Sequence, residues 1–190
     1  MKYLFILVCI FPSIAMAHGV ESSAGFLSGV VHPMLGWEHL LAMIAVGMLG
    51  SQNHSAAVWQ VPAAFITSML IGLYLGESGV LLTQHQLAIA ISLILFGLLI
   101  TFRTKIPVSI VILVVLFFGV FHGYAHGIEI VGLVNPTGFR KGFFMGSVII
   151  HIIGICLGLV PAHYLGFHKG LKVSGSGMVV LGCWIALVGY

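Results

Sequence analysis

Charged residues are scarce in this sequence. Only 6% of its 190 residues are Asp, Glu, Lys or Arg, and 60% are hydrophobic. Soluble domains carry about 25% charged residues, so the composition excludes an ordinary water-soluble protein. The mean hydropathy of +1.20 indicates an integral membrane protein. The formal net charge of +3 is too small to favour nucleic acid as a partner.

Cysteine is scarce too, and two common motifs are missing. Cys9 lies in the apolar core of an N-terminal signal, and Cys156 and Cys183 lie in apolar segments, so no disulfide framework is expected. The phosphate-binding pattern G-x-x-x-x-G-K-[ST] does not occur, which argues against an ATP-driven motor. The zinc-protease pattern H-E-x-x-H does not occur either, which argues against a metal hydrolase.

Residues 1–17 have the pattern of a cleavable secretory signal. Lys2 precedes an apolar core, and A-M-A at 15–17 is a small-residue cleavage site. Cleavage would make His18 the first residue of the mature chain, where its imidazole and the free amino group could chelate a metal together. An uncleaved first helix is the alternative to cleavage, and a plain polar tail is the alternative to chelation.

Six apolar segments follow, each near the ~20 residues that a membrane-spanning helix needs. They are predicted at Phe26–Leu49, Val58–Gly76, Leu87–Phe102, Pro107–His126, Phe139–Tyr164 and Val173–Tyr190. The sequence therefore predicts an all-α membrane protein, with a single six-helix transmembrane domain over residues 18–190. Many of its 25 glycines are spaced four apart, as in Gly119/Gly123/Gly127, and are expected to let helices pack closely.

Loop cations predict the orientation. Four of them lie between segments three and four or between five and six, at Arg103, Lys105, Lys169 and Lys172. Because cytoplasmic loops carry the excess of Lys and Arg, these loops are expected in the cytoplasm. The mature N-terminus would then be periplasmic, in a multi-pass protein of the bacterial inner membrane.

The first polar cluster reads H-P-M-L-G-W-E-H, at His32–His39, and heads the first apolar segment. Strongly polar side chains inside a bilayer are costly unless paired, so they are candidates for function. Pro33 suits the first turn of a helix. If one helix ran through both histidines, they would share a face. The competing interpretation is a polar helix end at the membrane surface, with Glu38 hydrated.

The second cluster reads F-H-G-Y-A-H-G-I-E, at Phe121–Glu129. His122 and His126 are one turn apart, and Glu129 follows three residues later, so all three share a face if the helix persists. Two such imidazoles can bind one divalent metal, and a carboxylate can add a ligand or orient a ring. Hydrogen-bonded structural histidines are the alternative. The topology places both clusters in the outer parts of their segments, where they would form one site if the segments touch.

Three further polar residues lie outside the two clusters. His151 is expected near the bilayer middle, about 15 Å along a helix from Lys141, as an inward step for the ion or as a hydrogen-bonded core residue. His85 is expected to be solvated in a loop, and Glu77 is expected to be a hydrated helix end.

The two clusters resemble the motifs of the HupE/UreJ family of hydrogenase and urease accessory membrane proteins. The first motif of that family is close to H-P-x-x-G-x-D-H followed by L-A-M-x-x-V-G, and the second is F-H-G-x-A-H-G-x-E. This sequence has Glu38 at the position where the family usually has Asp. His18 and His151 match a histidine at the mature start and one in the fifth span. The resemblance implies uptake of nickel, or of cobalt or another divalent metal, for metalloenzyme maturation. By the same resemblance, the candidate metal contacts are His32, Glu38, His39, His122, His126 and Glu129.

The sequence therefore predicts a permease for a divalent transition-metal ion rather than an enzyme. Imidazole and carboxylate suit nickel, cobalt, zinc or copper, and the ligand types alone do not choose among them. Movement would be driven by the ion gradient or the membrane potential. The alternatives are an intramembrane zinc-dependent hydrolase, in which the metal activates water, and a haem-b electron carrier with histidine axial ligands.

Overall fold

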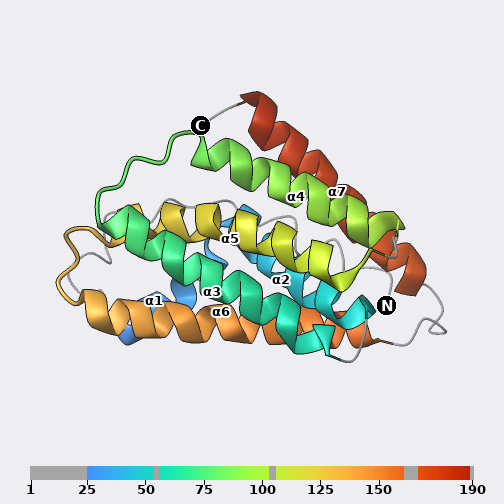
Figure 1. Ribbon diagram of the computed structural model, residues 1–190, viewed down its shortest axis with the longest axis horizontal. Helices are drawn as coiled ribbons and strands as arrows, with labels where there is room; N and C mark the ends of the chain where they lie inside the picture. The colour runs from blue at the N-terminus through green and yellow to red at the C-terminus, as the bar shows by residue number, and fades with distance from the viewer. Residues whose placement is uncertain (1–24, 54–55, 103–105, 161–166, 189–190) are drawn as a thin grey trace.

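The computed structural model describes residues 25–53, 56–102, 106–160 and 167–188, and within these ranges its regular elements are helices (Figure 1). The elements are α1 (Phe26–Val31), the 3₁₀ helix η3 (His32–Met34), α2 (Trp37–Asn53), α3 (Ala57–Glu77), α4 (His85–Phe102), α5 (Val108–Ile130), α6 (Pro136–Leu159) and α7 (Phe167–Val188). The proposed signal at 1–17 and His18 lie outside the described residues.

Helices α3 to α7 are each long and apolar enough to cross a membrane, and α1–η3 with α2 pass the same test together as a bent pair. The prediction of an all-α membrane protein is confirmed. Helix α6 ends at Leu159, where Val160 leaves the helical conformation (φ −57°, ψ 125°), as expected of a residue that precedes proline. The predicted end of this segment at Tyr164 lies outside the described residues. The last helix begins at Phe167, six residues before the predicted Val173.

The first apolar segment, predicted at Phe26–Leu49, is not one continuous helix, so the condition under which His32 and His39 would share a helical face is not met. The chain bends by 82° between Phe26–Met34 and Trp37–Gln52. Pro33 has no N–H to donate and its ring disfavours a continuous α-helix. The chain makes a 3₁₀ turn instead, closed by Leu35 N–H donating to the His32 carbonyl at 3.0 Å. His32 and His39 therefore do not share the face of a straight helix.

Close helix pairs hold the bundle together. Helix α5 packs along α3, α7 along α4, and α6 along both α1 and α2, while α3 also contacts α2. In Figure 1 the pair α4/α7 lies along one side of the bundle and α6 along the opposite side. A side-chain carbon at Gly123 would overlap the Met69 backbone, and one at Gly127 would overlap the Leu73 backbone. The expectation that these glycines allow close packing is confirmed, and this packing holds α5 directly against α3.

Candidate metal site

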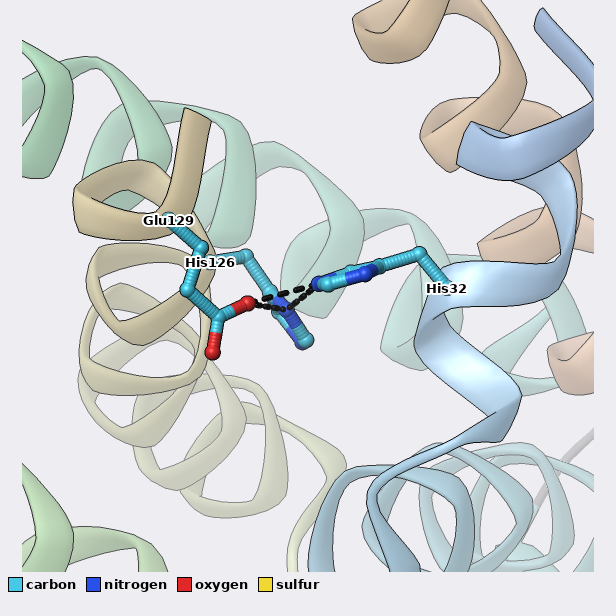
Figure 2. A group of neighbouring side chains, drawn as sticks. All are labelled: His32, His126 and Glu129. Carbon is cyan, nitrogen blue, oxygen red and sulfur yellow. Dashed lines mark hydrogen bonds and ion pairs between the residues drawn. The ribbon is translucent and has the colours of Figure 1, made fainter. Parts of the chain in front are cut away.

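Three side chains from the two sequence motifs meet at one end of the bundle. We call His32, His126 and Glu129 the surface group (Figure 2). His32 Nε2 lies 2.6 Å from Glu129 Oε2 and 3.1 Å from His126 Nδ1, and the last two atoms are 3.5 Å apart. Ligand atoms around a tetrahedral ion at 2.0–2.1 Å are about 3.3 Å apart. The surface group could therefore hold a metal ion with little movement.

The local structure explains how this group forms. Helix α5 continues to Ile130, so His126 and Glu129 lie on one face, as the i,i+3 spacing requires. His32 comes from η3, where the bend directs its ring across to α5 (Figure 2). The ring of Phe139 on α6 packs edge-on against it, with centroids 5.0 Å apart. Because the Glu129 side chain is 54% exposed and that of His126 only 5%, the group is open to solvent on its carboxylate side.

Further histidines continue from the surface group into the protein. The His39 ring lies 4.3 Å from the His126 ring and 5.0 Å from the His122 ring, measured between centroids. His39 Nδ1 also lies 3.4 Å from Glu38 Oε1. The ring of Phe65 contacts both His122 and His151, at 5.4 and 5.5 Å between ring centroids. We call His39, His122 and His151 the inner rings; all three are buried.

Both motifs therefore lie in contact, although a role in metal binding stays a prediction for each of their residues. Glu38 contacts His39 and is not part of the three-atom surface group. His151 is not part of the three-atom surface group either, and its ring contacts the same Phe65 ring as His122 does. The possible amino-terminal chelate at His18 falls outside the described residues.

Sequence reasoning missed several residues that contact the histidines. Ser92 on α4 places its hydroxyl 2.9 Å from His122 Nε2, and the ring of Phe65 on α3 contacts the rings of both His122 and His151. A single serine or phenylalanine in an apolar helix carries no signal in the sequence. Only the packing of α4 and α3 against α5 shows which residue faces His122.

Two minor expectations need correction. His85 begins α4 and is half-buried, with Nδ1 3.2 Å from the Leu82 carbonyl and its ring against Tyr124, so it is not a solvated loop residue. Glu77 is not simply hydrated, because it forms a two-point ion pair with Arg140 on α6. Both differences arise because a neighbouring element packs over a position that looks exposed from the sequence.

Comparisons with known proteins agree with the motifs. The family profile described as "HupE / UreJ protein" matches residues 6–185. The chain is 42% identical over 171 residues to "Protein HupE" of Rhizobium leguminosarum bv. viciae, a similarity that covers 90% of this chain and 89% of that protein. No solved structure matches the chain. With two specific motifs, a match over nearly its whole length and a membrane-spanning helical fold, the chain belongs to the HupE/UreJ family.

Proposed function

We propose that the protein is a membrane permease for a divalent transition-metal ion, with nickel as the first choice, and that it supplies metalloenzyme maturation of the hydrogenase or urease type. The observation that carries the proposal is the surface group. Two imidazole nitrogens and one carboxylate oxygen from separate spans lie within 4.8 Å of one another at the end of a membrane bundle. This donor set suits nickel, cobalt, zinc and copper, and the family resemblance favours nickel.

The geometry supports a capture step followed by inward movement. The exposed carboxylate of Glu129 can meet a hydrated cation, and the buried ring of His126 can replace part of its water shell. The inner rings, His39, His122 and His151, are buried inside the bundle, where the ion would pass next. A membrane potential supplies about 2.3 kcal/mol per unit charge per 100 mV, so a divalent ion gains about twice that figure without ATP.

The orientation and processing belong to the same proposal. Loop cations favour a bacterial inner membrane with the mature N-terminus in the periplasm, which puts the surface group on the periplasmic side. Removal of residues 1–17 would leave His18 at the start of the chain. N-terminal sequencing of the purified protein tests the cleavage, and a sequence that begins at Met1 would contradict it.

Uptake of radioactive nickel by expressing cells tests the function. We expect His126→Ala to reduce uptake to the background of cells that lack the protein, and Glu129→Gln to reduce it strongly, at equal amounts of protein in the membrane. His85→Ala is the matched control, because it removes a half-buried imidazole that lies on α4 against Tyr124 instead of in the surface group. Wild-type uptake in both site variants would reject the proposal.

A further inference from the structure

Four buried imidazole nitrogens have no hydrogen-bond partner within the described part of the chain. They are His39 Nε2, His122 Nδ1, His126 Nε2 and His151 Nε2. Each of these residues is at most 7% exposed. Buried polar atoms are nearly always paired, so a group of unpaired ones in a native structure requires an explanation, such as an ion or a water molecule.

In each inner ring, the partner of the second nitrogen shows whether the unpaired nitrogen carries the proton or a free lone pair. His151 Nδ1 lies 2.7 Å from the Ser147 carbonyl oxygen, which can only accept. Nδ1 must therefore carry the proton, and the unpaired Nε2 has a free lone pair. A neutral imidazole whose other nitrogen is fixed in this way is the form that binds a metal.

The same reasoning applies to His122 through Ser92. The Ser92 hydroxyl donates its hydrogen to the Ile89 carbonyl at 2.7 Å. With its only hydrogen on that carbonyl, the Ser92 oxygen can accept from His122 Nε2, which lies 2.9 Å away. This places the proton on Nε2 and leaves the lone pair on the unpaired Nδ1.

His39 follows the pattern with a carboxylate. Its Nδ1 lies 3.4 Å from Glu38 Oε1, and a nearby carboxylate favours the proton on that nitrogen. The unpaired Nε2 then has the lone pair. The inner rings thus have three different acceptors, a hydroxyl, a carbonyl and a carboxylate, and each leaves one buried nitrogen able to bind a cation.

We propose that the inner rings form an all-imidazole relay that takes the ion from the surface group, and that Ser92 is a positioning residue for it. The inference rests on the proposed permease function. His126 connects the two parts, because its Nδ1 belongs to the surface group whereas its Nε2 is unpaired and its ring lies 4.3 Å from that of His39. His122 is eight residues from the end of α5 at Ile130, a depth of about 12 Å along the helix.

The relay differs from the surface group in charge. Its three metal-binding atoms are neutral nitrogens, and the Glu38 carboxylate contacts only the first of its rings, His39. An ion beside His122 or His151 therefore keeps more of its charge uncompensated than one beside Glu129. Conduction requires sites that bind well enough to admit an ion and weakly enough to release it. The surface group, which contains a carboxylate, would admit the ion, and the neutral nitrogens of the relay would bind it weakly enough to release it.

Two variants test the relay in the full-length protein. Ser92→Ala removes the acceptor for His122 Nε2, and His151→Gln removes the last imidazole of the relay while keeping a polar side chain. Loss of a residue that orients a metal ligand typically costs about 10–100-fold in affinity or activity. We expect both variants to lower nickel uptake by about tenfold or more, while the purified proteins still bind one Ni²⁺ at the surface group. Ser68→Ala is the control, because Ser68 is an equally buried serine whose hydroxyl donates to the Phe65 carbonyl.

A spectroscopic measurement separates positioning from a merely structural role. Nitrogen-15 NMR of histidine-labelled protein in lipid nanodiscs should show the His122 proton on Nε2 in the wild type and on both nitrogens in turn in Ser92→Ala. Wild-type uptake by Ser92→Ala and His151→Gln, with none by His126→Ala, would reject the relay and leave the permease intact. Wild-type uptake by His126→Ala as well would reject the permease. An unchanged His122 spectrum in Ser92→Ala would reject the role of Ser92.

Discussion

Replacing Glu129 by glutamine tests the surface group most directly. Glu129 is the carboxylate of this group, with Oε2 2.6 Å from His32 Nε2 and 3.5 Å from His126 Nδ1. Glu129→Gln keeps the side-chain length and one oxygen but removes the negative charge. Because the side chain is 54% exposed, the change should weaken ion binding without disturbing the fold.

The size of the effect follows from the charge and the exposure. Two unit charges 4 Å apart in water attract by about 1 kcal/mol. A divalent ion at a ligand distance of about 2 Å doubles the charge and halves the distance, which gives about 4 kcal/mol. Dissolved salt screens the exposed carboxylate further, and the amide oxygen remains a weaker ligand. We therefore expect a loss of about 2 kcal/mol, or roughly 30-fold in Kd.

Isothermal titration calorimetry measures this loss directly. The purified protein is titrated with Ni²⁺ at about pH 7.5, where free imidazole is mostly neutral. Glu77→Gln is the matched control, because it removes a carboxylate that pairs with Arg140 outside the surface group, and its Kd should equal that of the wild type. A Glu129→Gln protein that binds Ni²⁺ as tightly as the wild type would refute the assignment of this carboxylate as a ligand.

Three further predictions concern pH, the bend and the packing. Protonated imidazole cannot ligate a metal, so Ni²⁺ binding measured by equilibrium dialysis should be weaker at about pH 5 than at about pH 7.5; equal binding at the two pH values would contradict imidazole ligands. Pro33→Ala permits a straighter helix and should reduce nickel uptake by moving His32 away from α5, whereas unchanged uptake would show that the bend does not depend on this proline. A side chain at Gly123 would overlap the Met69 backbone, so Gly123→Val should lower the melting temperature in detergent, while Gly177→Ala, which meets nothing within 4 Å, should not; equal melting temperatures would contradict the close packing.

Much of this architecture could be predicted from the sequence because it depends on local properties. Apolar length places the spans, and the spacing of His122, His126 and Glu129 alone puts them on one helical face. The bend that follows Pro33 is harder to predict from the sequence, because a proline fits either the first turn of a new helix or a break within a continuing helix. The partner of His122 could not be predicted, since it depends on how α4 rotates against α5.

The interruption in the first span limits which changes the motif His32–His39 can tolerate. Wound as an α-helix, the chain from His32 to His39 would extend about 10 Å, yet both rings lie against the single ring of His126, at 5.0 and 4.3 Å. Adding or deleting one residue between them would rotate everything downstream by about 100° and turn Glu38 and His39 away from α5. Point substitutions at positions 34 and 35, whose side chains are exposed, leave that geometry alone. The length of this short stretch is therefore more tightly constrained than its composition.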